Sequence, residues 1–494
     1  MAAFDASANA DRSKFNVDLI DEADFRRKTE VFEQWLLDNG AEFPQLEIKC
    51  YDDEVRGVHA KEDIKSDTLC ISIPLNCLIT VEMGKDTEIG RKILDARLDL
   101  DAPKHVFLML FMLTDMRNES SFFKPYYDIL PQKMSNMPIF WTDDELRYLE
   151  GSYMLQQIAD RKEAIIEDYD AICDIAPEFS EIATLDGFMW ARMCVCSRNF
   201  GLVINGVRTS AMVPHADMLN HYRPRETKWT FDNSLQAFTI ITIADITAGA
   251  QIYDSYGQKC NHRFLLNYGF SIENNVEADG FCPNEVSILF ELNDADPLYE
   301  RKHTLFLRDG YPGGRRLRLC VARNDNLTLA LSLLRIIVAN EEEFEALLLN
   351  QPYAYRTIKN ITKPISVSNE RKAMELFNNM LDALESAYSK PLEDDEERLR
   401  SGELAPFSNE RHAVIQVKGE KVVLRFFKDF AQKCIRALSG EMDALCEDVY
   451  AREHTIIADQ LCNTLKPLVR GGSQRTVSRV ATAKGGASRG PMIV

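Results

Sequence analysis

The sequence predicts an α+β fold in which a small β domain is split by a helical insert and followed by an all-helical C-terminal domain. Short runs rich in Ile, Val and Leu fill residues 46–81, and strand-like runs return between Thr209 and Ile252. From about residue 84 to residue 200, and again from residue 284 into the 460s, apolar residues recur at helical spacing. A length of 494 residues also predicts more than one core, because single cores stop growing near ~250–300 residues.

The first expected element is an amphipathic helix over residues 24–39, which Gly40 ends. Its apolar stripe comprises Val31, Phe32, Trp35 and Leu36. In the β domain we expect strands at 69–74, 77–81 and 238–243, within a small antiparallel sheet. The expected bounds are 1–45 for a helical lead-in, 46–283 for the β domain with its insert at about 84–200, 284–468 for the helical domain and 469–494 for a tail.

Helix signals are clear in the insert. Thr142-Asp-Asp-Glu145 is a capping box, in which the Thr side chain satisfies an early helix amide while Glu145 reaches back. The apolar run Val106–Leu113 is too short for a membrane span, which needs about 20 residues, and is interpreted as a buried helix. The acid-free segment 471–494 is interpreted as a disordered basic tail. Further helices are expected at 160–175, 186–198, 327–339 and 342–350, and a solvated helix or loop at 393–400.

The composition argues against several classes of protein. A net charge of −19 is unlike a nucleic-acid binder, because affinity for phosphates comes from Lys and Arg, and it fits a protein that attracts basic substrate segments. The twelve cysteines form no CxxC pair, so we expect reduced thiols and no metal site. The first 30 residues mix acids and bases, unlike a secretory signal or a transit peptide. We therefore expect a protein of the cytoplasm, with the nucleus as a further location, that binds neither nucleic acid nor membranes.

Three motifs follow one another within residues 213–275. They are Asp217-Met-Leu-Asn220-His221, Asp254-Ser-Tyr256-Gly257 and Asn267-Tyr268-Gly269-Phe270. In this order they resemble the C-terminal half of a SET domain, most of all in the group that contains the Rubisco large-subunit lysine methyltransferases and the actin-histidine methyltransferases. The N-terminal half is similar too, at residues 56–64, 74–82 and 121–131.

The resemblance covers residues 50–275 well and residues 285–460 loosely. It implies a SET β-fold split by a helical insert and followed by an all-α substrate-binding domain. It further implies that S-adenosyl-L-methionine is the cofactor, that the activity is methyl transfer to a protein side chain, and that the C-terminal domain binds the protein substrate.

Tyr256 is the catalytic candidate, because a phenol beside the transferred methyl can polarise it through weak CH···O contacts and align the incoming amine. Its alternative is a core tyrosine at a strand end. Asn220 and His221 are expected to hold the cofactor, through backbone bonds to its adenine and side-chain bonds to neighbouring strands; elsewhere such a pair would be a turn. Gly57 is assigned to the cofactor site because it permits close backbone approach.

The remaining site residues are assigned by resemblance. Glu82 and Arg198 are expected at the cofactor, with a surface acid and a surface arginine as their alternatives. Tyr268 and Phe270 are expected to wall the methyl end of the cofactor, and Tyr268 also the substrate channel; their alternative is a place in the core. Asp217 is grouped with the channel, where we expect it to buttress the neighbouring loop.

Phe200 favours lysine as the acceptor. Lysine-modifying relatives look like Ser-Arg-x-Phe at residues 197–200, whereas the actin-histidine branch carries Asn in place of Phe200. An apolar ring suits the alkyl stem of a lysine, which is deprotonated only when desolvated because its free pKa is about 10.4. We therefore expect methylation of a lysine in a non-histone protein by a monomer. The alternatives are histidine N-methylation of actin or a similar target and, from another class, a catalytically silent SET scaffold. A Ser/His hydrolase is not supported, because the sequence has no GxSxG motif.

Overall fold

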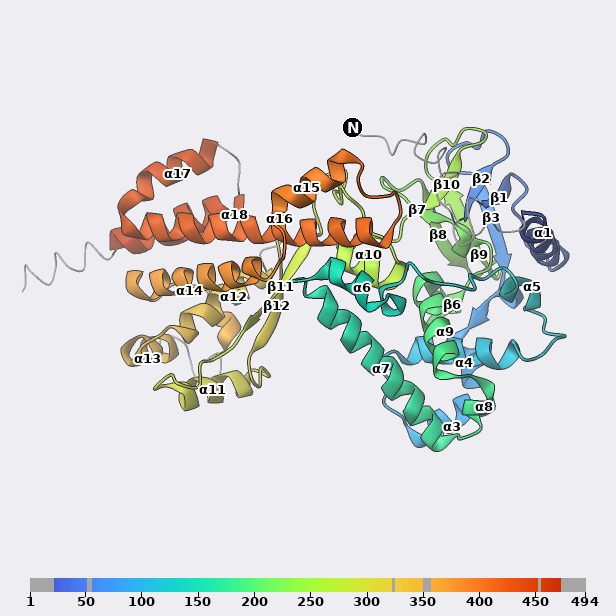
Figure 1. Ribbon diagram of the computed structural model, residues 1–494, viewed down its shortest axis with the longest axis horizontal. Coiled ribbons are helices and arrows are strands. Elements are labelled where there is room, and N and C mark those ends of the chain that lie inside the picture. The colour runs from blue at the N-terminus through green and yellow to red at the C-terminus, as the bar shows by residue number, and fades with distance from the viewer. Residues whose placement is uncertain (1–21, 51–55, 322–324, 350–356, 452–454, 472–494) are drawn as a thin grey trace, which may run out of the picture. The chain divides into compact units, whose positions relative to one another are not determined.

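Figure 1 shows the computed structural model, which describes residues 22–50, 56–321, 325–349, 357–451 and 455–471. The chain divides into two compact units. The first comprises the residues up to Leu146, Met154–Ser271 and Glu277–Gly280. The second comprises Arg147–Tyr153, Ile272–Val276 and the chain from Phe281 onward.

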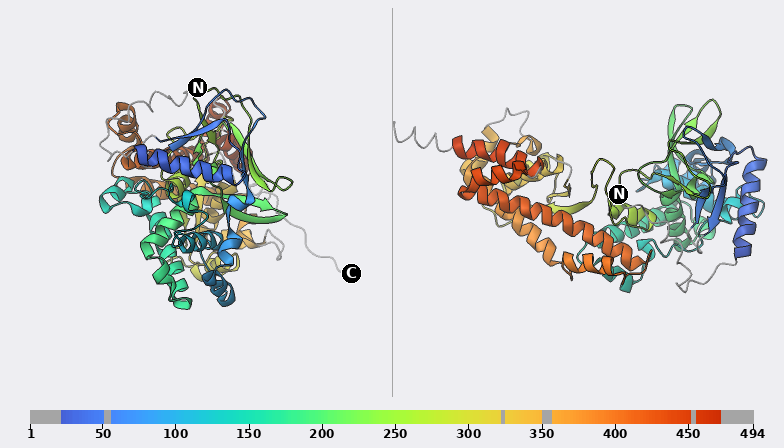
Figure 2. Two further views of the ribbon diagram at one scale, coloured as in Figure 1. Left: turned by 90° about the vertical axis from the view of Figure 1, so that its right-hand side faces the viewer. Right: turned by 90° about the horizontal axis from the view of Figure 1, so that it is seen from above.

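The expected N-terminal helix is confirmed as α1 (Glu22–Asp38). Phe32 and Leu36 are fully buried, but Val31 is 53% exposed, so its place on the apolar stripe was predicted wrongly. Gly40, with φ +88°, ends the helix in a conformation that side-chain-bearing residues rarely adopt. Figure 2 shows α1, in dark blue, along the outside of the stranded part of the first unit.

The described residues of the first unit form three small sheets, and each combines strands from both sides of the insert. The expectation of one antiparallel sheet is therefore corrected, because its strands pair in three separate groups. One pair, β7 with β10, is parallel. The sheet orders are β1 (Leu46–Cys50), β2 (Arg56–Ala60), β10 (Gln251–Asp254), β7 (Asn220–His221); β3 (Leu69–Pro74), β9 (Ala237–Thr242), β8 (Thr227–Asp232); and β4 (Ile79–Thr80), β6 (Val207–Met212), β5 (Asn199–Ile204).

The insert is helical, as expected. Its last helix ends at Arg198, and β5 begins at the next residue, Asn199. Val106–Leu113 lies in a helix whose apolar side chains are mostly buried. The capping box is present: the Thr142 amide donates to Glu145 Oε2 at 2.9 Å, and the Glu145 amide donates to Thr142 Oγ1 at 3.3 Å. The helices are α2 (Val81–Lys85), α3 (Glu88–Ala96), α4 (Pro103–Asp115), α5 (Lys124–Tyr127), α6 (Asp143–Leu146), α7 (Met154–Ile175), α8 (Phe179–Ile182) and α9 (Leu185–Arg198). In the described part of the chain, no helix has both the length and the apolar character of a membrane span.

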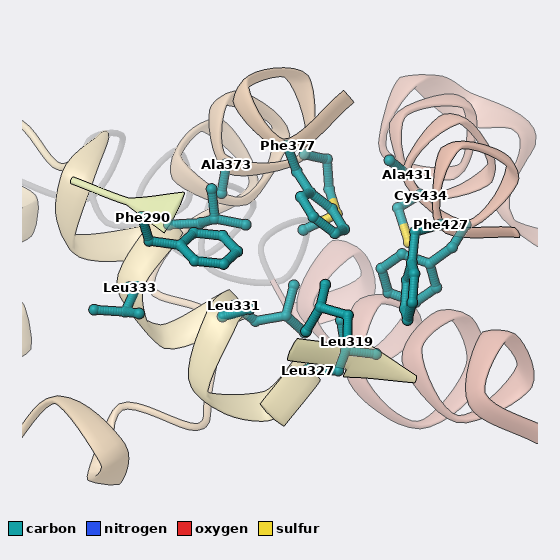
Figure 3. Packing of buried hydrophobic residues seen from close by; sticks show 14 of the residues in the cluster. Phe290, Leu319, Leu327, Leu331, Leu333, Ala373, Phe377, Phe427, Ala431 and Cys434 are labelled. Carbon is teal, nitrogen blue, oxygen red and sulfur yellow. The ribbon is translucent and has the colours of Figure 1, made fainter. Parts of the chain in front are cut away.

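The second unit is largely helical and has a core of its own. Figure 3 shows Phe290, Leu331, Phe377 and Phe427 among its packed side chains. The helices expected at 327–339 and 342–350 are found as α12 and α13, although residue 350 lies outside the described residues. Residues 393–400, expected as a solvated helix or loop, lie in the helix α15. The helices are α11 (Tyr299–Arg308), α12 (Asp325–Ile337), α13 (Glu341–Leu349), α14 (Val367–Ser386), α15 (Leu392–Ser401), α16 (Asn409–Arg436), α17 (Met442–Ala451) and α18 (Thr455–Ala458).

Two features of this unit differ from the sequence prediction. An antiparallel pair, β11 (Glu285–Phe290) and β12 (Arg315–Cys320), interrupts the expected all-helical domain. Its alternating side chains bury Val286, Ile288 and Phe290 opposite Leu317 and Leu319 in the core. The tail was expected from residue 469, but residues 469–471 are still helical, and the rest of it lies outside the described residues.

Candidate active site

The parallel pairing of β7 with β10 brings two of the predicted motifs together. Asn220 lies opposite Tyr253, and His221 lies opposite Asp254. The Asn220 side-chain amide donates to the Arg56 carbonyl at 2.7 Å and to Gln251 Oε1 at 2.7 Å. This amide therefore ties β7 to both β2 and β10. Gly57, the next residue of β2, is buried beside this junction, so the structure brings it to the predicted Asn-His motif.

His221 is fixed in one neutral form. Its Nδ1 accepts a hydrogen bond from the Tyr256 amide at 2.9 Å, so the ring proton is carried by Nε2. Burial, with the positive charges of Arg223 and Lys259, lowers the pKa of His221 to about 3. Nε2 is buried without a hydrogen-bond partner among the described residues. An unsatisfied buried donor at this position fits a site completed by a polar ligand.

Tyr256 lies at the centre of a cluster of aromatic rings. Its ring stacks on Tyr268, with the centroids 4.7 Å apart, and on His221 at 5.2 Å. Phe270 lies 6.4 Å from it. The Tyr256 hydroxyl donates to the Leu219 carbonyl at 2.8 Å, and burial raises the pKa of the phenol above its usual value. The hydroxyl therefore keeps its proton, while its oxygen lone pairs remain free to accept a weak contact.

Arg198 and Asp217 form a largely buried ion pair close to Tyr256. Arg198 Nη1 lies 3.2 Å from Asp217 Oδ2 and 3.1 Å from the Asp217 carbonyl. The Tyr126 hydroxyl donates to Asp217 Oδ2 at 2.8 Å, and the Asp217 side chain has no exposed surface. Asp217 therefore supports the turn Ala216–Met218, as a buttress, rather than lining a channel. Arg198 takes part in the same support, and its expected contact with the cofactor stays a prediction from resemblance.

Glu82 and Phe200 contact other parts of the first unit. Glu82 is exposed at the start of α2 and accepts a hydrogen bond from Thr209 Oγ1, on β6, at 3.0 Å. Phe200, on β5, packs edge-on against Trp229 at 5.4 Å and Phe238 at 4.9 Å. Neither set of contacts includes Tyr256, so these two assignments stay predictions from resemblance.

The sequence placed Asp254, two residues before Tyr256, in a motif, but no role was predicted for it. Its side chain is buried, and one carboxylate oxygen accepts the Ser255 amide at 2.6 Å. Burial raises the pKa of Asp254 to about 6, against the opposing effects of the Ser255 and Trp229 hydrogen bonds and of nearby Arg225. Trp229 thus connects Asp254 with Phe200. The available signal was an acid at the end of a strand, two residues before the candidate catalytic tyrosine.

Comparison with known proteins gives these features a family context. The SET domain family matches residues 55–257, and the family described as Rubisco LSMT substrate-binding matches residues 293–424. An actin-histidine N-methyltransferase of Gallus gallus is 27% identical over 406 residues, covering 79% of this chain and 66% of that protein. The Homo sapiens protein of the same name is 26% identical over 403 residues, with the same coverage. The chain thus matches just under two thirds of the length of these relatives.

Solved structures share the fold. The SET domain of LSMT bound to lysine and AdoHcy aligns with a TM-score of 0.70 at 22% identity, covering 84% of this chain and 92% of that one. Rubisco LSMT bound to AdoMet aligns with a TM-score of 0.68 at 23% identity, covering 83% and 93%. The two family matches follow the division of the chain into a stranded first unit and a largely helical second unit. The chain therefore combines a SET domain with a Rubisco LSMT substrate-binding domain.

Proposed function

We propose that the chain is an S-adenosyl-L-methionine-dependent protein methyltransferase that modifies lysine in a non-histone protein. The observation that carries the proposal is the junction of β7 and β10. There His221 Nδ1 accepts a hydrogen bond from the Tyr256 amide, and the Tyr256 hydroxyl donates one to the Leu219 carbonyl. The SET family match and the AdoMet-bound and AdoHcy-bound structural neighbours support this reading.

The residues at this junction fit the cofactor. Asn220, His221 and Gly57 would hold it. The Asn220 side chain links the strands β7, β2 and β10, so the main chains of β7 and β2 are held together at this junction. The unpartnered Nε2 of His221 offers one hydrogen bond from a buried position. When bound, S-adenosyl-L-methionine supplies an electrophilic methyl group.

Tyr256 would act on the reacting groups. Its hydroxyl proton is donated to the Leu219 carbonyl, so the lone pairs of the hydroxyl oxygen can accept weak contacts from C–H or N–H groups of the reactants. Tyr268 and Phe270 lie beside it and present apolar ring surface to the site. A lysine ammonium entering such surroundings loses its proton more readily than in water, because burial disfavours the charged form. The free amine is the nucleophile that methyl transfer requires.

Histidine N-methylation is the second candidate, and the named relatives favour it. Both relatives described above are actin-histidine N-methyltransferases. Phe200 supports lysine, because its ring lies in an aromatic group with Trp229 and Phe238 that provides no amide to bind an imidazole. We further propose that the second unit binds the protein substrate and that the enzyme works in the cytoplasm; the substrate-binding family match supports the first of these points.

The test is to incubate the purified full-length chain with cell extract and isotope-labelled cofactor, followed by mass spectrometry of the labelled proteins. We expect a methylated lysine side chain. A methyl on a histidine nitrogen would replace the lysine assignment and keep the methyltransferase. Absence of labelling together with absence of cofactor binding by calorimetry would favour a SET scaffold without catalytic activity.

A further inference from the structure

His215 is a fully buried histidine whose ring makes no hydrogen bond with any residue that the structure describes. The ring stacks on Phe43, with the centroids 4.1 Å apart, and on Phe32 of α1, with the centroids 6.5 Å apart. Its two nitrogens are buried without hydrogen-bond partners among the described residues. Glu33 Oε1 lies 3.7 Å from Nε2, which is too long for a hydrogen bond. The ring therefore contributes to the structure by its shape and not by its polar atoms.

The backbone of His215 is strained. Its φ of +72° and ψ of −47° lie in a region that residues with a side chain rarely occupy. Such strain persists only where surrounding packing determines the conformation, and it clusters at functional sites. Here the packing is the Phe32–His215–Phe43 stack, which we call the aromatic clamp.

The strained residue begins the turn that leads to the active site. The His215 carbonyl accepts the Met218 amide at 3.1 Å, and the Val213 carbonyl accepts the Asp217 amide at 3.1 Å. The chain then reaches Leu219, whose carbonyl accepts the Tyr256 hydroxyl. A change of φ and ψ at His215 would therefore redirect the carbonyl that orients the candidate catalytic phenol.

Helix α1 contacts this turn along a second route. Phe32, which has no exposed surface, also lies 6.1 Å from the Tyr126 ring, and the Tyr126 hydroxyl donates to Asp217. One side chain of α1 thus contacts the residue at which the turn begins and the residue that supports Asp217 within it.

We propose that His215 is a positioning residue of the methyl-transfer site, and that α1 helps to position this site through the aromatic clamp. The proposal rests on the proposed methyltransferase function. Phe32 and Phe43 hold the His215 ring, the ring holds the strained turn, and the turn holds the Leu219 carbonyl against Tyr256. The requirement at position 215 is a flat ring of about this size, and no proton is transferred to or from it.

Two substitutions at position 215 separate the effect of the flat ring from that of the ring nitrogens. His215→Phe keeps a flat ring and removes the unpartnered nitrogens, whereas His215→Gly permits the same backbone conformation without the ring. Phe32→Ala opens the clamp from α1, and Val31→Ala on the exposed side of the same helix is the matched control. For each full-length protein we would measure kcat, KM for the cofactor, thermal unfolding and hydrogen–deuterium exchange of residues 216–221.

We expect His215→Gly and Phe32→Ala to lower kcat by about tenfold or more, since small misplacements of reacting groups have effects of this order. KM for the cofactor should change less than kcat, and exchange at residues 216–221 should become faster. The kcat of His215→Phe and of Val31→Ala should stay within about threefold of the wild-type value, a smaller change than a misplaced reacting group causes.

Two outcomes would overturn the proposal. Loss of turnover in His215→Phe equal to that in His215→Gly would assign the role to the ring nitrogens. Unchanged kcat and unchanged exchange in His215→Gly would show that the ring does not position the turn. Thermal unfolding separates either result from a failure to fold. If the wild-type protein transfers no methyl group, the proposed function fails, and the exchange measurement still tests the aromatic clamp.

Discussion

The hydroxyl of Tyr256 donates a hydrogen bond to the main-chain carbonyl of Leu219, with 2.8 Å between the two oxygens. This bond orients the phenol because a hydroxyl proton is otherwise free to rotate. Leu219 directly precedes Asn220 and His221 in the sequence, and His221 in turn accepts the Tyr256 amide. The candidate catalytic residue and the candidate cofactor strand therefore orient each other through two hydrogen bonds.

Tyr256→Phe tests the role of this hydroxyl. The ring stacks on Tyr268 and His221 are kept, so cofactor affinity should change little. We expect kcat to fall by about 10²-fold or more, the size seen when one preorganised polar group at a reacting centre is removed. Steady-state kinetics and calorimetry with the cofactor measure the two effects. Tyr253→Phe, in strand β10 three residues earlier, is the matched control. A near-normal kcat in Tyr256→Phe would exclude a catalytic role of the hydroxyl.

Asp254→Asn tests the buried carboxylate beside this tyrosine. Burial raises the pKa of Asp254 from 3.8 to about 6, so the folded protein binds this proton more tightly than the unfolded chain does. The stabilisation from its protonated form is therefore present below pH ~4 and is lost as the pH rises through about 6. At neutral pH the charged form lowers the free energy of unfolding by at most about 3 kcal/mol.

Asparagine can still accept the Ser255 amide but carries no charge. We therefore expect Asp254→Asn to be more stable than the wild type at about pH 7.5 and nearly equal to it at about pH 4, in urea unfolding. Asp232→Asn is the control of opposite sign, because hydrogen bonds from Ser234 and Leu235 lower the pKa of Asp232. A variant Asp254→Asn that is less stable at neutral pH would contradict the destabilising role of the charge.

A buried ion pair in the second unit gives a prediction on stability. Arg335 Nε and Nη2 donate to the two Glu370 oxygens at 2.7 and 2.8 Å, and both side chains are almost wholly buried. Arg335→Met leaves the Glu370 charge buried without its guanidinium and should lower the free energy of unfolding by about 3–5 kcal/mol. The double variant Arg335→Met/Glu370→Leu removes both charges and should recover much of that loss. Denaturant unfolding measures it; a double variant no more stable than the single one would be inconsistent with this explanation.

Local periodicity was sufficient to predict much of the fold. The strand at residues 69–74 and the helix ending at Arg198 were located from side-chain spacing, which the chain carries in every short window. The β11–β12 pair was missed because its two strands are short and separated by a helix, so neither forms a recognisable hairpin with its neighbour in sequence. Val31 was misplaced because the stripe on α1 is narrower than helical spacing alone suggests.

The site was predictable only where its residues lie in motifs. Asn220, His221 and Tyr256 were found this way, and the structure brings them together. The support of Asp217 by Tyr126, 91 residues away in the chain, depends on tertiary packing and leaves no local pattern. The strained backbone of His215 is equally invisible, because a positive φ at a histidine has no signature in composition or spacing.

Phe200→Asn tests which side chain accepts the methyl group. Phe200 packs against Trp229 and Phe238, and a polar amide placed there either finds a polar partner or costs about 1–3 kcal/mol unsatisfied. An alkyl stem provides no such partner, whereas an imidazole does. We therefore expect the variant to methylate a lysine peptide more slowly and a matched histidine peptide faster than the wild type, measured by mass spectrometry of both peptides in one reaction. Phe200→Leu, which stays apolar, is the control and should keep the lysine preference. A wild-type enzyme that methylates histidine would exclude the lysine assignment and leave the methyltransferase proposal in place.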